Sequence, residues 1–119
     1  NVELLGTGKP LREFLYVDDL AEAIFLTLKK NKNSIKKIFK KEFPLMNVGS
    51  GRNISIKKLA YLIKDISNFK GKIKFNSTYP DGVFKKNLNS NKIRKLGWSP
   101  KIKLEEGLKR IILSKEVTN

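Results

Sequence analysis

The sequence predicts a small α/β fold of short strands and about four helices. Short apolar or alternating stretches, bounded by glycine and proline, are typical of strands. Between them, apolar residues recur with a helical period, which indicates amphipathic helices. The chain has 119 residues, 39% of them hydrophobic, so residues 1–119 are expected to fold as a single domain with a modest core.

Four segments are expected to form strands. Residues 2–5 (VELL) run into the turn GTGKP, and residues 13–17 (EFLYV) precede the first helix. Residues 45–48 (LMNV) are interpreted as a buried strand that enters the turn GSG, and residues 72–75 (KIKF) alternate between polar and apolar side chains. The glycines and prolines that follow mark where the first of these strands should end.

The first helix is expected from Asp18 or Asp19 to about Lys30. Either aspartate can cap free backbone N–H groups, and Lys29 and Lys30 complement the helix dipole in the last turn. The two aspartates could instead form a paired-carboxylate acid/base site, but capping is the simpler prediction for adjacent residues at a helix start. Three apolar residues share one face of this helix: Leu20, Ile24 and Leu28.

Three further helices are expected. Ser55 should cap the second, and Gly71 should end it. The apolar stripe of this helix has the clearest helical period in the chain: Ile56, Leu59, Ala60, Ile63 and Ile66. Ser90 should cap a short third helix, which should end at a C′ glycine, Gly97. Trp98 should then pack a corner against the last helix, which starts at the sequence LEEGL.

Residues 31–43 (NKNSIKKIFKKEF) are predicted to be a variable surface insertion. They are polar and rich in lysine, and Ile35, Ile38 and Phe39 give them a weak amphipathic pattern, so one or two helical turns are expected. An amphipathic contact with a membrane is the alternative, and a solvated excursion is favoured over it.

The composition excludes several kinds of site. Neither cysteine nor histidine occurs, which excludes disulfides and thiolate metal sites and removes the commonest general base and metal ligand. No apolar run approaches the roughly 20 residues of a transmembrane helix, and no signal peptide opens the chain. We therefore expect a cytoplasmic protein with no metal site and no membrane partner. The first residue is Asn1 rather than Met, which suggests a piece of a longer protein.

The formal net charge of +15 has two explanations. A basic field can attract nucleic acid or phosphorylated ligands. A lysine-heavy composition can equally spread positive charge along the chain without a function. A basic nucleic-acid-binding module therefore stays an alternative, although no zinc-finger spacing or RNP-type motif supports it.

Two glycine loops fail to match cofactor-binding motifs. GTGKP lacks the first glycine of a P-loop, where Glu3 stands, and has Pro10 after the lysine instead of Ser or Thr. NVGSGRNI has Ile54 at the third glycine position of a dinucleotide fingerprint. The chain is therefore expected to bind no cofactor by itself.

Three motifs follow one another along the chain: GKPLREFLYVDDLAEAI (residues 8–24), NVGSG (47–51) and IRKLGWSPKIKLEEGLKRII (93–112). Together they resemble the extended short-chain dehydrogenases/reductases of the NAD-dependent epimerase/dehydratase superfamily that act on nucleotide sugars. The resemblance spans nearly the whole chain. It implies the C-terminal, substrate-binding portion of such an enzyme, with the Rossmann domain missing.

The segment YPDGVFKKNLN (residues 79–89) narrows the resemblance. It is similar to a segment of the GDP-L-fucose synthase family, NADPH-dependent 3,5-epimerases and 4-reductases that act on GDP-4-keto-6-deoxy-D-mannose. Tyr79 and Asn89 depart from the family's pattern, and Leu5 stands where an aromatic residue is often found.

This resemblance implies four substrate-binding residues. Arg12 and Lys86 match the family's basic residues near the nucleotide diphosphate, while Asp81 shapes the approach and Leu5 lies at a substrate-contacting position. An arginine can grip two phosphate oxygens, and a lysine adds a point charge.

The residues by themselves leave alternatives open. Arg12 could pair with Glu13 or Asp18 instead, and Lys86 could be a solvated lysine. Lys85 should point to the opposite face from Lys86 in an extended strand, so at most one of the two should face a ligand.

The resemblance also implies where the chemistry lies. The family's NADP(H) loop and its Ser, Tyr and Lys catalytic groups belong to an N-terminal dinucleotide-binding domain. No such catalytic set can be assembled here, because Tyr61 and Lys64 are three residues apart instead of four. We therefore expect a GDP-sugar-binding portion that is inert alone and belongs to an NADP-dependent, homodimeric parent enzyme. Another nucleotide-sugar epimerase or dehydratase is the alternative.

Overall fold

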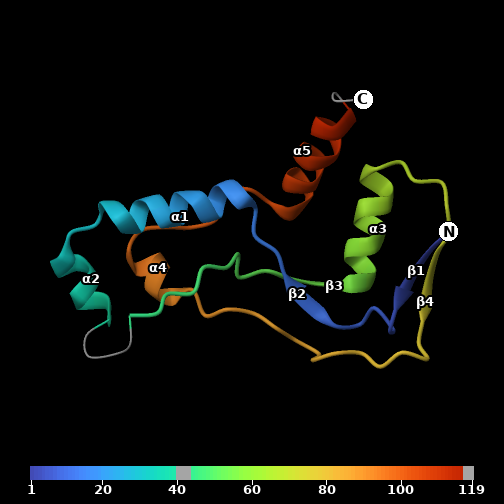
Figure 1. Ribbon diagram of the computed structural model, residues 1–119, viewed down its shortest axis with the longest axis horizontal. Coiled ribbons are helices and arrows are strands. Elements are labelled where there is room, and N and C mark those ends of the chain that lie inside the picture. The colour runs from blue at the N-terminus through green and yellow to red at the C-terminus, as the bar shows by residue number, and fades with distance from the viewer. Residues whose placement is uncertain (40–43, 117–119) are drawn as a thin grey trace. The chain divides into compact units, whose positions relative to one another are not determined.

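The computed structural model describes residues 1–39 and 44–116 of the chain. They divide into two compact units (Figure 1). Unit 1 consists of Asn1–Arg12, Asn53–Lys86 and the C-terminal segment from Leu104, and unit 2 consists of Glu13–Arg52 and Asn87–Lys103. Residues 40–43, which belong to the predicted insertion, lie outside the described residues.

Unit 1 is built on a parallel strand pair. β1 (Val2–Leu5) pairs with β4 (Ile73–Asn76), and Val2 lies opposite Ile73 (Figure 1). The sequence predicts both strands to within one residue. The unit also contains helices α3 (Ile56–Ile66) and α5 (Leu104–Glu116), which contact each other.

Helix α3 begins as predicted and ends earlier. The Ser55 hydroxyl accepts a hydrogen bond from the Lys58 N–H at 3.2 Å, so the serine caps the helix. The helix ends at Ile66 rather than at Gly71, with Ser67 as its C-cap. Asn68 then takes a left-handed conformation (φ 52°), and asparagine tolerates this backbone better than most residues.

Two strand predictions are wrong. The strand expected at residues 13–17 is β2 (Leu11–Glu13), which pairs with β3 (Asn53–Ser55), and the next helix already begins at Val17. Residues 45–48 form no strand, and neither of the two strand pairs among the described residues includes them. Their apolar side chains Met46 and Val48 still pack on a core.

Unit 2 contains the best-buried core of the described residues. Its three helices are α1 (Val17–Lys29), α2 (Lys32–Phe39) and α4 (Asn91–Lys95) (Figure 1). The buried core residues are Ala23, Ile93, Leu96 and Trp98. Ile35 and Ile38 of α2 pack against them, so the helical turns predicted inside residues 31–43 form and contribute apolar side chains to the core. The described part of the chain thus has five helices, where the sequence predicts about four.

Helix α4 ends at Gly97 as predicted, but its N-cap residue, Ser90, makes no side-chain cap hydrogen bond, so that capping prediction is wrong. Gly97 has φ 96°, its N–H donates to the Arg94 carbonyl, and the Trp98 N–H reaches the Ile93 carbonyl. These two bonds form a Schellman motif, which glycine favours because a Cβ would strain the left-handed residue. Trp98 is 3% exposed and packs with residues of α1 and α4, where the sequence predicts packing on the last helix.

The apolar face predicted for α1 does not enter the core. Ile24 is 54% exposed and Leu28 is 78% exposed, while Ala23 is buried. The exposed apolar residues of this helix, called the α1 face below, are Val17, Leu20, Ile24, Phe25 and Leu28. The helix therefore buries its narrow Ala23 side and presents its broad apolar side outward, which reverses the usual arrangement of an amphipathic helix.

Candidate functional site

A parallel bridge places the lysines of the PDG segment. Leu11 lies opposite Lys85, because the Leu11 N–H donates to the Phe84 carbonyl at 2.7 Å and the Lys86 N–H donates to the Leu11 carbonyl at 3.3 Å. Successive side chains in extended backbone point to opposite faces. Lys85 therefore shares a face with Leu11, and Lys86 shares the other face with Arg12.

Arg12 is half-buried and holds the PDG segment. Its Nη1 donates to the carbonyls of Leu11 at 2.7 Å and Val83 at 2.9 Å, and its Nη2 lies beside Gly82. Within the described residues, Arg12 forms no ion pair with Glu13 or Asp18, so those alternatives are not what fixes it. Part of the guanidinium is thus bonded to main-chain carbonyls of unit 1.

Glu13 braces unit 2 instead of pairing with Arg12. One carboxylate oxygen accepts from the Gly51 N–H, and the other accepts from the Leu88 N–H at 2.8 Å. A side chain at Gly49 would place its Cβ 2.5 Å from Glu13 Oε1. The glycine of the NVGSG turn therefore makes room for a carboxylate of the same chain.

Asp81 is bound by a residue 74 positions earlier in the chain. The Thr7 N–H donates to Asp81 Oδ1 at 2.8 Å, and the Thr7 hydroxyl donates to Asp81 Oδ2. These two bonds, aided by the charge of Lys9, hold the pKa of Asp81 below its usual value. Leu5, the remaining predicted site residue, is exposed at the end of β1. All four predicted residues thus lie in unit 1.

The GTGKP loop is filled by side chains of unit 1. A Cβ on Gly6 (φ 88°) would lie 2.5 Å from Asp81 Oδ1, and a Cβ on Gly8 (φ 73°) would lie 2.5 Å from a ring carbon of Phe75. Neither glycine faces open space of the kind that a phosphate cradle needs. The loop and the NVGSG turn are both shaped by protein contacts.

The paired-carboxylate alternative is not supported by the geometry. Asp19 is 2% exposed, and its two oxygens accept from the N–H groups of Lys101 at 3.1 Å and Ile102 at 3.0 Å, while Asp18 is exposed. The capping prediction is also wrong, because the N-cap is Tyr16 and has no side-chain cap bond. Asp19 instead fastens the segment after Trp98 to α1.

Two residues of this region were not expected from the sequence. Thr7 reads as an ordinary turn residue, and only its distant bond to Asp81 reveals its role. Phe84 is 64% exposed and stands two residues before Lys86, directly before the bridge between Leu11 and Lys85. An exposed aromatic residue beside two cations was the available signal in the printed sequence.

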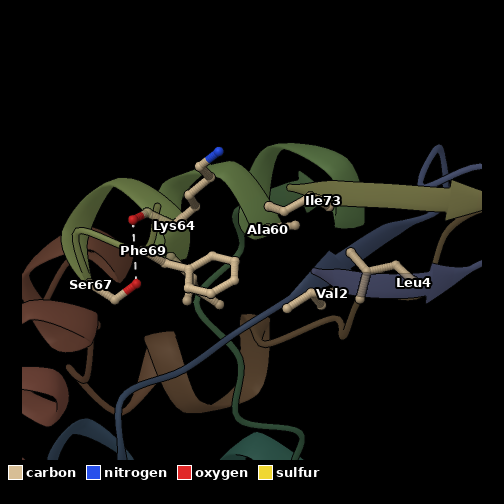
Figure 2. A pocket seen from close by; sticks show the side chains of 8 residues that line it. Val2, Leu4, Ala60, Lys64, Ser67, Phe69 and Ile73 are labelled. Carbon is tan, nitrogen blue, oxygen red and sulfur yellow. Dashed lines mark hydrogen bonds between the residues drawn. The ribbon is translucent and has the colours of Figure 1, made fainter. Parts of the chain in front are cut away.

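A separate apolar pocket of about 270 Å³ lies in unit 1 (Figure 2). It is lined by Val2, Leu4, Ala60, Ile63, Phe69 and Ile73, with Lys64 and Ser67 at the end of α3. The Ser67 hydroxyl is bonded to the Lys64 carbonyl, as Figure 2 shows. None of the four predicted site residues lines this pocket, and its apolar walls do not suit a diphosphate.

Within the described residues, no helix is both long and apolar enough to cross a membrane. The same part of the chain has no group of three acidic, histidine or cysteine residues that could hold a metal ion.

Comparison with known proteins identifies the class. Residues 1–49 match the NAD dependent epimerase/dehydratase family. The fold agrees: a GDP-6-OMe-4-keto-L-xylo-heptose reductase from Campylobacter jejuni superposes with a TM-score of 0.85 at 36% identity over 98% of this chain. A UDP-glucose 4-epimerase from Thermotoga maritima gives a TM-score of 0.79 at 30% identity over 99% of the chain. The chain therefore belongs to the NAD-dependent epimerase/dehydratase family of extended short-chain dehydrogenases/reductases.

Within that family, the chain is similar to GDP-L-fucose synthases. It is 44% identical over 107 residues to a probable GDP-L-fucose synthase of Oryza sativa, a match that covers 90% of this chain. The chain spans about 30% of the length of that relative, and 34–35% of the two solved structures.

Proposed function

We propose that this chain is the nucleotide-sugar-binding portion of a GDP-L-fucose synthase-like, NADPH-dependent epimerase/reductase. The observation that carries the proposal is the bridge between Leu11 and Lys85, since it directs Arg12 and Lys86 to one face. Two cations on one face suit a diphosphate, which offers several anionic oxygens. The names of the relatives, which include GDP-sugar enzymes, support the same ligand class.

Each residue of the proposed site has a distinct role. Lys86 supplies a mobile point charge to the diphosphate, and the Arg12 groups not bonded to Leu11 and Val83 supply directional N–H donors. Leu5 and Phe84 are exposed and offer apolar surface to the base or sugar. Asp81 shapes the approach to the site from its position in the PDG turn.

The redox chemistry is assigned to a domain outside this chain. NADP(H), when bound there, supplies the hydride for the reduction. The GTGKP loop and the NVGSG turn support this assignment, because side chains of this chain occupy the space beside Gly6, Gly8 and Gly49. We further propose that this portion is inert alone, and that its parent is cytoplasmic and works as a homodimer.

The α1 face is the proposed docking surface for that dinucleotide-binding domain. Its five exposed apolar residues lie on one helix, and single exposed apolar residues need no explanation whereas a contiguous set does. The relatives are about three times longer than this chain, which leaves ample chain to cover the face.

Titration calorimetry of the 119-residue chain with GDP at low salt tests the proposed ligand. We expect saturable binding with one site, weakened about tenfold or more by Arg12→Ala, because that arginine also holds the turn. Absence of GDP binding by a folded chain, or binding unchanged by Arg12→Ala, would contradict the proposal.

Two alternatives have their own readouts. The similarity to a UDP-glucose 4-epimerase favours a second candidate, a UDP-sugar epimerase, which predicts tighter binding of UDP than of GDP in the same titration. A nucleic-acid-binding module predicts a steep, salt-dependent affinity for DNA or RNA in a gel shift.

A further inference from the structure

The contact between Thr7 and Asp81 joins a fixed loop to the turn that carries the site. The loop is fixed by main-chain bonds on both sides of Thr7: the Gly6 N–H donates to the Asn76 carbonyl at 2.8 Å, and the Lys57 N–H donates to the Gly8 carbonyl at 2.9 Å. The Thr7 hydroxyl donates to Asp81 and also accepts from the Lys9 N–H at 3.2 Å. The Thr7 hydroxyl therefore both donates and accepts hydrogen bonds within unit 1.

The segment after Asp81 is held at a second point only two residues later. Arg12 donates to the Val83 carbonyl, and the bridge to Leu11 follows at once. The position of Lys86 thus depends on two anchors, Thr7–Asp81 before Gly82 and Arg12–Val83 after it.

We propose that Thr7 and Asp81 form a latch that positions Lys86 and Arg12 for a nucleoside diphosphate without touching it. This proposal rests on the proposed function. It makes Asp81 a positioning residue, although the sequence resemblance assigns it to substrate binding. A carboxylate facing a diphosphate would repel it. The Asp81 carboxylate instead accepts hydrogen bonds from Thr7 at both oxygens, so it can fix the turn without contacting the ligand.

The first test is GDP binding to variants of the 119-residue chain. Thr7→Val removes the hydroxyl at nearly constant volume, and Asp81→Asn removes the charge. We expect each substitution to weaken GDP binding about fivefold. The double variant should lose no more affinity than the single variant with the larger loss, because both substitutions remove the same contact. Thr7→Ser should bind GDP like the parent. Thr78→Val is the matched control, because Thr78 donates to Asn76 Oδ1 in a similar exposed bond outside the latch.

The second test does not depend on any ligand. Amide hydrogen exchange should accelerate about fivefold or more at Leu11 and Lys86 in both latch variants, because their N–H bonds hold the bridge. Exchange at Val2, whose N–H donates to the Lys72 carbonyl, should stay unchanged.

The outcomes separate the latch from the proposed function. If the parent chain does not bind GDP, the proposed function fails, and the exchange data still decide the latch. Unchanged exchange at Leu11 and Lys86 in Asp81→Asn would overturn the latch. Additive losses of affinity, or a loss in Asp81→Asn with none in Thr7→Val, would also overturn it, since they would make Asp81 a direct ligand.

Discussion

Lys85 lies directly opposite Leu11, and this pairing turns two adjacent lysines to opposite faces of the same segment. Lys85 and Lys86 have the same charge, the same exposure class and neighbouring positions in the chain. They differ only in the face that the bridge gives them. A substitution of Lys85 is therefore a matched control for the same substitution of Lys86.

We expect Lys86→Gln to weaken GDP binding about tenfold at low salt, and Lys85→Gln to leave it within about twofold. Both substitutions lower the net charge by one, so a general electrostatic effect would weaken binding equally in the two variants. Calorimetry at low and at moderate salt measures this, and equal losses would contradict the assignment of Lys86.

Phe84 is expected to contribute to the base or sugar and not to the phosphates. Phe84→Ala should weaken GDP binding about fivefold while leaving inorganic pyrophosphate binding unchanged, because only GDP offers a ring or apolar surface to stack on. Competition titrations with both ligands distinguish the two effects. An equal loss for pyrophosphate would mean that the substitution disturbs the turn.

Asp81 provides a pH dependence with a defined sign. Its pKa is lowered by the two bonds from Thr7, so its contribution to stability is present above the unfolded-state pKa of about 4 and is lost as the pH falls through the lower folded-state pKa. NMR titration of the Asp81 carboxyl carbon should give a midpoint below the ordinary value. Thr7→Val should raise that midpoint, and an unchanged midpoint would show that the hydroxyl bond is not its cause.

Asp19 is expected to matter for stability and not for catalysis. Asp19→Ala should lower the free energy of unfolding by about 2–4 kcal/mol, because it removes a buried carboxylate and leaves the part-buried N–H groups of Lys101 and Ile102 without their acceptor. Asp18→Ala, at the exposed neighbouring position, should change it by less than about 1 kcal/mol. Urea unfolding followed by circular dichroism compares the two, and similar losses would contradict the assigned role.

The α1 face gives a prediction about association. Leu28→Lys should leave the unfolding free energy of this chain within about 0.5 kcal/mol, because the side chain is already exposed. The same substitution should weaken association with a separately produced dinucleotide-binding domain, since a buried charge would replace an apolar contact. Lys30→Gln is the control variant for this association. Thr27 is unsuitable as a control position, because its hydroxyl donates to the Ala23 carbonyl. If Leu28→Lys unfolds the chain, the α1 face is a core surface.

The sequence by itself determined the local features that depend on neighbouring residues. The existence of strands near residues 2–5 and 73–76, the Ser55 cap and the Gly97 stop follow from side-chain type and backbone preference within a few positions. The three motifs likewise indicate the family, because their residues and their order are read from the sequence without knowledge of any contact.

Only the tertiary structure decided what distant residues do to one another. Asp19 and Asp81 look alike in the sequence as turn or cap residues, yet one holds N–H groups 82 and 83 positions away and the other is held by Thr7. The exposure of the α1 face was also not predictable, because periodicity shows that a helix has an apolar side but not what covers it. The physical reason is the same in each case: a local pattern fixes which groups need partners, and only the path of the chain supplies them.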